Sequence, residues 1–132
     1  MRLYPINLTI NKMHEENRRI RRVADQIKNE LAWLIDYKLK DPQLGLVTLT
    51  RIKLSPDLKL ASLYFSVYGR DKEQKEYVAI LNRASHFLRR ELALKIKMRS
   101  IPELRFFYDD SLEYAEHIQN LFKKIHDDEN NR

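Results

Sequence analysis

Lysine and arginine side chains are concentrated between residues 83 and 108, and a basic cluster of this kind can bind a polyanion. The stretch holds seven basic residues against two glutamates, which accounts for most of the chain's formal net charge of +6. Arginine suits phosphate because its planar guanidinium group can donate two parallel hydrogen bonds, whereas lysine supplies a mobile point charge. We therefore predict that a polyanion is contacted by Arg83, Arg89, Arg90, Lys95, Lys97 and Arg99.

A second basic cluster lies at the start of the first predicted helix, which covers about residues 15 to 40. Apolar residues there recur at spacings of three and four, which indicates one buried helical stripe: Ile20, Val23, Ala24, Ile27, Leu31, Leu34 and Ile35. The cluster consists of Arg18, Arg19, Arg21 and Arg22, near a helix end where positive charge is disfavoured. Two interpretations stay open: these arginines contact phosphates, or they form a solvated face with nearby acidic residues.

The remaining pattern predicts an α+β domain with three strands. Residues 46–54 and 59–68 form an antiparallel hairpin, because a short turn cluster at residues 55–57 separates two β-rich runs. A long helix over residues 72–97 is expected to bend at Ala84 and Ser85, where small side chains interrupt the bulky pattern. A third strand follows at residues 103–108.

The two ends of the chain are predicted to be peripheral. Residues 1–14 lack a clear period and read as a flexible extension, so the single domain covers residues 15–126. A final helix from Ser111 to about His126 carries an apolar stripe, and Asp110 with Glu113 resembles a capping box at its start. The acidic tail, residues 127–132, is expected to be disordered.

Several kinds of chemistry are disfavoured by composition. The chain has no cysteine and only two glycines, which excludes thiolate catalysis and argues against a glycine-rich phosphate loop. Its four histidines lack metal-ligand spacing, so we expect no metal site. No string in the chain is a catalytic signature, so we also expect no cofactor and no enzymatic activity. A small metal-dependent nuclease using Asp109 and Asp110 is the competing enzymatic hypothesis, although helix capping explains these residues more simply.

Aromatic residues near the predicted strands suggest a base-stacking platform as an alternative: Tyr64, Tyr68, Phe107 and Tyr108. We favour the other interpretation, in which most of these rings are core or edge residues of a helix-covered sheet. The single tryptophan, Trp33, lies off the helical stripe and is expected to cover a core edge.

Several sequence strings, taken together with the element order, resemble the ribosome-binding factor A family. They are R-R-V at residues 21–23, DPQLGLVTLTRIKLSPDLKLASLYFSVYG at 41–69, the segment 81–92, M-R-S-I-P-E-L at 98–104 and F-x-Y-D-x-S at 106–111. The resemblance covers roughly residues 18–125 and implies a type II KH-like fold with an additional C-terminal helix. It also implies a helix kink read as Ala-x-Gly in place of the GXXG loop of ordinary KH domains. Ala84 matches the alanine, and His86 stands where the glycine is expected.

The same resemblance implies a function in ribosome assembly. The partners would be 16S rRNA and the free 30S subunit, with adjacent small-subunit proteins, and the role would be late 30S maturation and 16S rRNA processing in the cytoplasm. A monomer that binds no membrane, with a part in cold adaptation, is expected. Ser85 and His86 join the arginines and lysines named above as predicted RNA contacts. The runner-up is a general KH-like module for single-stranded RNA or DNA, and the missing GXXG loop argues against it.

Overall fold

A three-stranded mixed sheet is the centre of the fold in the computed structural model, which describes residues 4–130. Strands β1 (Leu46–Leu54) and β2 (Leu60–Tyr68) form the predicted antiparallel hairpin. Strand β3 (Glu103–Tyr108) pairs with β2 in parallel, so the spatial order is β1-β2-β3. Parallel pairing needs a long crossover, and the segment between β2 and β3 supplies it with two helices.

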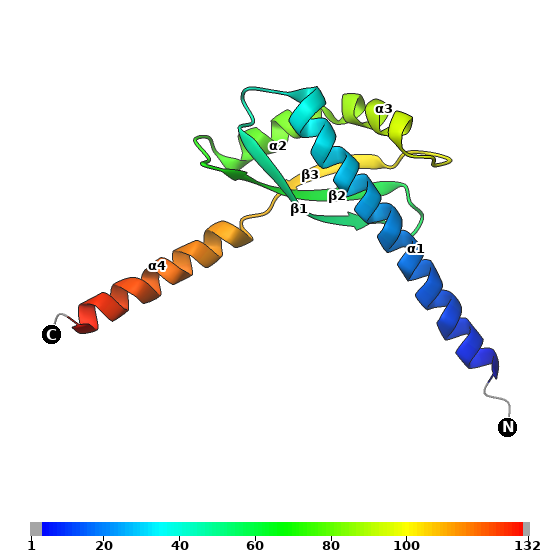
Figure 1. Cartoon of the computed structure of the whole chain (residues 1–132), viewed down its shortest axis with the longest axis horizontal. Coiled ribbons are helices and arrows are strands. Elements are labelled where there is room, and N and C mark those ends of the chain that lie inside the picture. The colour runs from blue at the N-terminus through cyan, green and yellow to red at the C-terminus, as the bar shows by residue number, and fades with distance from the viewer. Residues whose placement is uncertain (1–3, 131–132) are drawn as a thin grey trace.

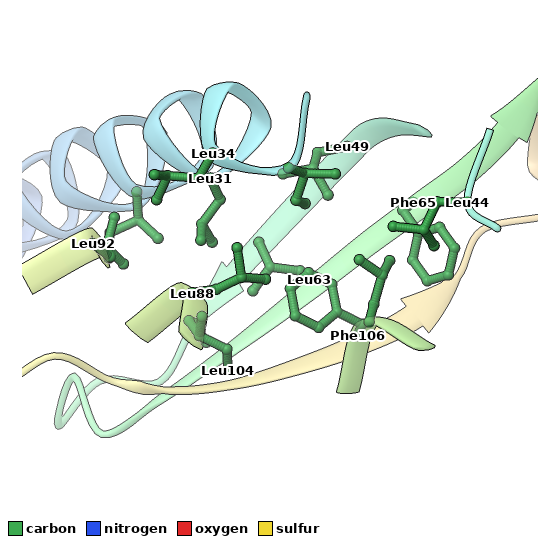
Figure 2. Packing of buried hydrophobic residues seen from close by; sticks show 14 of the residues in the cluster. Leu31, Leu34, Leu44, Leu49, Leu63, Phe65, Leu88, Leu92, Leu104 and Phe106 are labelled. Atoms are coloured by element: carbon green, nitrogen blue, oxygen red, sulfur yellow. The ribbon is translucent and has the colours of Figure 1, made fainter. Parts of the chain in front are cut away.

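Helices cover one face of this sheet. α1 (Tyr4–Leu34) continues into a π-helical turn (Ile35–Leu39), and the crossover consists of α2 (Gln74–Arg83) and α3 (Ser85–Lys95). Figure 2 shows apolar side chains of α1, α3 and the strands packed together, among them Leu31, Leu34, Leu49, Leu63, Phe65, Leu88, Leu92, Leu104 and Phe106. Burying each of these side chains contributes about 1.5–3 kcal/mol, so this layer is the main source of stability.

The alternation of β2 defines two faces. Ala61, Leu63, Phe65 and Val67 are buried against the helices, as their spacing predicted. The intervening side chains point to the other face, which we call the open face of the sheet. There Tyr64 is half-buried and Tyr68 is exposed.

The turn between β1 and β2 is held by side-chain hydrogen bonds. The Ser55 hydroxyl donates to Oδ1 of Asp57 at 2.7 Å, and the backbone N–H of Lys59 donates to the same oxygen at 3.1 Å. These two bonds lower the pKa of Asp57, the Ser55 hydroxyl having the larger effect. Leu58 adopts a φ of 61°, in the left-handed region. The turn thereby fixes the backbone from which the Lys59 side chain projects.

The first helix begins earlier than the sequence predicted. Residues 4–14 were expected to be irregular, yet α1 starts at Tyr4. Pro5 is compatible with this start because a proline in the first helical turn removes no intrahelical hydrogen bond. Residues 1–3 and 131–132 lie outside the described part, and whether the N-terminal extension is flexible stays a prediction.

The last helix corrects two further expectations. α4 (Ser111–Asn130) extends beyond His126 through most of the predicted disordered tail, and none of its side chains is buried. Figure 1 shows α4 leading away from the sheet. The predicted stripe of Ala115, Ile118, Leu121, Phe122 and Ile125 is therefore not part of the core; Phe122, for example, is 68% exposed. Amphipathic spacing identified the helix but did not indicate what covers its apolar side.

The predicted capping box at the start of α4 is also wrong. Glu113 accepts hydrogen bonds from the Tyr108 hydroxyl at 2.6 Å and from Nε of Arg70 at 3.2 Å. Asp109 bonds to the first turn instead, since its Oδ1 accepts the N–H of Ser111 at 3.0 Å. Burial of the ring and, to a smaller extent, the hydrogen bond to Glu113 raise the pKa of Tyr108.

Within residues 4–130, no helix is long and apolar enough to cross a lipid bilayer.

Candidate nucleic-acid interface

α2 and α3 meet at Ala84, with no loop between them. The N–H of Ala84 donates to the carbonyl oxygens of Ile80 at 3.2 Å and Leu81 at 3.1 Å, and its own carbonyl accepts the N–H of Leu88 at 3.0 Å. Ala84 thus closes one helix and opens the next, so the chain bends without leaving a backbone group unpaired at this residue. Its φ of −81° and ψ of −2° are available to any residue.

The bend is fastened to the sheet by Asn82. Its side-chain amide donates to the carbonyl of Phe106 at 3.3 Å, and its side-chain oxygen accepts the N–H of Phe106 at 3.0 Å. These bonds pair backbone groups on the outer edge of β3, where no further strand is present among the described residues. Side chains at the bend are therefore held in a fixed position relative to the sheet.

His86 lies in the first turn of α3 and is exposed. In the described part of the chain, positive φ angles occur at Lys40, Gly45, Leu58 and Gly69, so the bend uses none. A histidine can therefore occupy the position where the family pattern has glycine without backbone strain.

A depression of about 400 Å³ lies beside the bend, lined by Lys59, Ser85, His86, Arg89, Ser100, Ile101 and Glu103. Three of these side chains can meet a phosphate: Lys59 from the β1–β2 turn, and His86 and Arg89 from α3. The N–H of Glu103 donates to the carbonyl of Lys59 at 2.8 Å, which holds the turn next to the start of β3. Sequence reasoning missed Lys59, because nothing local to the hairpin turn indicates that α3 packs beside it.

Arg89 also has a structural role. One of its terminal nitrogens, Nη2, donates to the carbonyl of Ile101 at 2.8 Å, and its Nε is buried without a hydrogen-bond partner. The guanidinium group thus joins α3 to the segment before β3 and leaves only part of its donor capacity for a ligand.

Arg83 lies apart from this depression. Its Nε donates to the carbonyl of Ala79 in its own helix at 3.3 Å, and its side chain lines a separate hollow with Gln43, Lys72, Glu76, Ala79 and Ile80. The predicted contacts therefore do not form one pocket, and Arg83 stands on a different side of the bend from His86 and Arg89.

Arg90, Lys95, Lys97 and Arg99 are exposed on α3 and the segment that follows it. Nζ of Lys95 lies 4.3 Å from the centre of the Trp33 ring, whose own centre is 5.5 Å from that of Tyr37. Trp33 is 41% exposed, so it borders the surface and Lys95 lies over it. The cation–π contact holds this lysine near α1.

Charge around the bend is not neutralised within the described residues. Their ion pairs join Arg70 to Glu113, Lys72 to Asp71, Lys75 to Glu73 and Arg105 to Glu103. None of these pairs uses a basic residue predicted to contact RNA. An uncompensated cationic surface attracts a polyanion and repels other cations.

Comparison with known proteins decides the family. A family model described as ribosome-binding factor A matches residues 19–122. The chain belongs to the ribosome-binding factor A family. It is 41% identical over 104 residues to the ribosome-binding factor A of Citrifermentans bemidjiense, an alignment that covers 79% of this chain and 87% of the relative.

Solved structures of ribosome-binding factor A agree with the fold. The crystal structure of the Thermus thermophilus protein matches with a TM-score of 0.61 and 31% identity, over 67% of this chain and 94% of that one. A Thermus thermophilus homology model fitted into the cryo-EM map of a 30S complex matches with a TM-score of 0.58 and 32% identity, over 67% and 93% of the two chains. The type II KH-like fold expected from the sequence is confirmed, with α4 as the additional C-terminal helix.

The ribosome-binding factor A match includes every predicted contact except Arg18. Arg18, Arg19, Arg21 and Arg22 are exposed on α1. Ile20 and Val23, which neighbour them in the sequence, pack against the core, so these arginines stand on the outer side of the middle of α1. In Figure 1 the N-terminal end of α1 extends beyond the sheet. Contact of these arginines with RNA stays a prediction.

The four aromatic residues near the strands divide between the two faces of the sheet, and two of them, Phe107 and Tyr108, lie on the edge strand β3. Phe107 is 42% exposed and lies beside Tyr64, with ring centres 5.5 Å apart, so neither ring belongs to the core. Tyr108 is half-buried: the centre of its ring lies 5.2 Å from that of Phe65, and the two ring planes are nearly perpendicular. Arg51, Lys53 and Arg105, which were not among the predicted contacts, are exposed on the open face.

Asp109 and Asp110 are neighbours in the sequence but have different surroundings. Asp109 accepts hydrogen bonds from the Thr50 hydroxyl at 2.6 Å and from the Ser111 N–H at 3.0 Å, and these bonds lower its pKa to about 2, the Thr50 bond most strongly. Asp110 is exposed. Over the described residues, no group of three or more carboxylates and histidines is arranged to hold a metal ion.

Proposed function

We propose that this chain is a ribosome assembly factor that binds the free or immature 30S subunit through 16S rRNA and assists its late maturation and rRNA processing. Membership of the ribosome-binding factor A family supports this proposal, and a Thermus thermophilus relative is described in a complex with 30S. The observation that carries it is the set of cationic side chains around Ala84, which have no acidic partner among the described residues.

The proposed mechanism depends on phosphate-binding side chains that the fold holds in fixed positions. Lys59, His86 and Arg89 are held beside the bend by the β1–β2 turn and by α3, so they fit one arrangement of phosphates better than others. A protein that binds one conformation of the rRNA more tightly shifts the population toward that conformation. No step in this mechanism requires a reacting group or a cofactor. We further propose that the protein acts as a monomer in the cytoplasm, and that it matters most in the cold, where incorrect RNA pairings dissociate slowly.

A general single-stranded nucleic-acid module is the second candidate. An ordinary KH domain clamps the nucleic-acid backbone with a GXXG loop between two helices. Here α3 starts at Ser85, directly after Ala84, so there is no loop in which backbone N–H groups could form that clamp. Binding at the bend must therefore rely on side chains, which favours a large preformed RNA surface over short oligonucleotides.

Sedimentation of the tagged protein with cell extract tests the proposal. We expect it to migrate with free 30S subunits and to be absent from 70S ribosomes and polysomes. Migration with translating ribosomes, or only at the top of the gradient, would overturn the assembly role. A charge-reversal control combines Lys123→Glu with Lys124→Glu on the projecting helix α4. Its migration shows whether the net charge of the protein alone determines binding to 30S subunits.

A further inference from the structure

A row of three side chains crosses the open face of the sheet. Arg51 on β1 is opposite Tyr64 on β2, and Tyr64 is opposite Phe107 on β3. The guanidinium carbon of Arg51 lies 4.2 Å from the centre of the Tyr64 ring, and the rings of Tyr64 and Phe107 are stacked at 5.5 Å with an angle of 28°. The row is therefore a continuous layer of flat groups that runs across all three strands.

An irregularity in β1 aims Arg51 into this row. The register shifts between Leu49 and Arg51, so Thr50 is an extra residue with no partner on β2. Leu49 points into the core, and regular alternation would turn Arg51 inward as well. The bulge turns Arg51 to the open face instead, as bulges commonly re-aim a side chain. The Thr50 hydroxyl fixes the bulge through its contacts with the carbonyl of Tyr64 at 3.2 Å and with Asp109 at 2.6 Å.

The next row on the same face, toward the β1–β2 turn, carries positive charge. Lys53 is opposite Ser62, which is opposite Arg105. Both cations are exposed, and Arg105 forms an exposed ion pair with Glu103 at 3.4 Å. Exposed pairs of this kind contribute little and are easily exchanged for another anion. The open face therefore combines exposed flat groups with cations, which is the combination that recognises single-stranded RNA.

We propose that the open face of the sheet binds unpaired nucleotides of RNA. Bases stack on the exposed ring of Phe107 and on the guanidinium group of Arg51, and Lys53 and Arg105 contact the phosphates on either side of them. This inference deepens the proposed function and rests on it for the identity of the RNA, since the bend and the open face would then hold two segments of 16S rRNA on different sides of one domain. Two linked contacts increase total affinity because the second becomes intramolecular.

RNA is favoured over a protein partner by charge complementarity. In the second row Lys53 and Arg105 stand against Glu103 alone, so this row has a positive surplus. Arg51 lines a hollow together with Asp109 and Asp110, so the first row adds no surplus of its own. The contiguous layer of flat groups is one row wide, with small Ser62 and Ser66 on either side along β2, and the exposed Tyr68 and Leu46 lie in a separate row beyond Ser66. An interface with a protein would be expected to offer a broader apolar centre.

A fluorescence anisotropy titration with a labelled single-stranded oligouridylate of about ten nucleotides tests the proposal on the full chain. Phe107→Ala is expected to weaken binding about tenfold, since base–aromatic stacking has effects of that order. Phe107→Leu retains apolar volume without a flat ring and is expected to weaken binding similarly. Arg51→Lys retains charge without a planar group and should fall between the wild type and Phe107→Ala. Phe122→Ala, an exposed phenylalanine on α4, is the matched control and should bind as the wild type does.

Two readouts separate this proposal from its alternatives. If Tyr64 and Phe107 only stabilise the sheet through cross-strand packing, Phe107→Leu will lower the thermal midpoint and leave affinity for the oligouridylate unchanged, which overturns the proposal. Unchanged binding of both Phe107 variants to 30S subunits that the wild type binds would overturn it too, while the proposed function stands. If the wild type binds oligouridylate through Phe107 but no 30S subunit, the proposed function fails and the stacking face remains.

Discussion

The Thr50 hydroxyl and the Asp109 carboxylate form a 2.6 Å hydrogen bond that joins the bulge of β1 to the residue after β3. The two residues are 59 positions apart in the sequence and belong to opposite edges of the sheet. The bond therefore spans the central strand at the end where α4 begins. It lowers the pKa of Asp109 and holds the bulge that turns Arg51 outward.

Replacing Asp109 is expected to change how stability depends on pH. The folded-state pKa of about 2 lies below the ordinary aspartate pKa of 3.8, so the ionised carboxylate stabilises the fold above about pH 4 and this contribution is lost as the pH falls toward 2. Asp109→Asn should cost about 1 kcal/mol at pH 7 and nothing near pH 2. Urea denaturation of both proteins across this range checks it. Asp110→Asn is the control, and parallel pH profiles for Asp109→Asn and the wild type would show that the bond to Thr50 is unimportant.

His86→Gly should destabilise the protein. His86 is in the first turn of α3, and the bend uses no positive φ angle, so glycine gains no conformational advantage there. It should instead cost about 0.5–1 kcal/mol through the entropy of the unfolded chain. Thermal denaturation of His86→Gly beside His86→Ala measures this cost. A glycine variant more stable than the alanine variant would mean that the bend is strained at this residue.

Arg89 and Arg90 are neighbours with different expected roles. Arg89→Ala removes the hydrogen bond to the Ile101 carbonyl and should cost about 1–2 kcal/mol. Arg90 is exposed, so Arg90→Ala should change stability by no more than about 0.5 kcal/mol and act on RNA binding alone. Denaturant midpoints for the two variants, with hydrogen exchange at residues 96–102, distinguish these roles. Equal stability of the two variants would contradict the structural role of Arg89.

Leu88 and Leu94 allow the same comparison for the core. Leu88 is 0% exposed and Leu94 is 81% exposed, although both lie on α3. Leu88→Ala should cost about 3 kcal/mol through a cavity where α3 packs on the core, whereas Leu94→Ala should cost less than about 0.5 kcal/mol. Calorimetry of the two variants measures this difference. Similar thermal midpoints would mean that the layer between the helices and the sheet is loosely packed around Leu88.

Local sequence patterns identified the elements and the strand faces well. The alternation of Ala61, Leu63, Phe65 and Val67 directly gave the buried face of β2, because strand side chains have a period of two. The small residues at Ala84 and Ser85 likewise marked the junction of α2 and α3, because bulky side chains surround them.

Features that depend on contacts between distant segments were not predictable in this way. Lys59 reaches the bend because β3 pairs with β2 in parallel beside the turn, and no residue near Lys59 indicates that pairing. The Thr50 hydroxyl at the bulge bonds to Asp109, which follows the strand at the opposite edge of the sheet. The apolar stripe of α4 showed which side chains share a face, but it carried no information on whether another segment covers them.

Equilibrium binding to purified 30S subunits tests the central claim most directly. Lys59→Glu combined with Arg90→Glu reverses two exposed charges near the bend, and Lys123→Glu combined with Lys124→Glu makes the same charge change on α4. We expect the first pair to weaken binding at least about tenfold and to reduce the dependence of affinity on salt, because fewer counterions are released. The second pair should bind within about twofold of the wild type at moderate salt. Wild-type affinity and an unchanged salt dependence for the Lys59 and Arg90 pair would contradict the account.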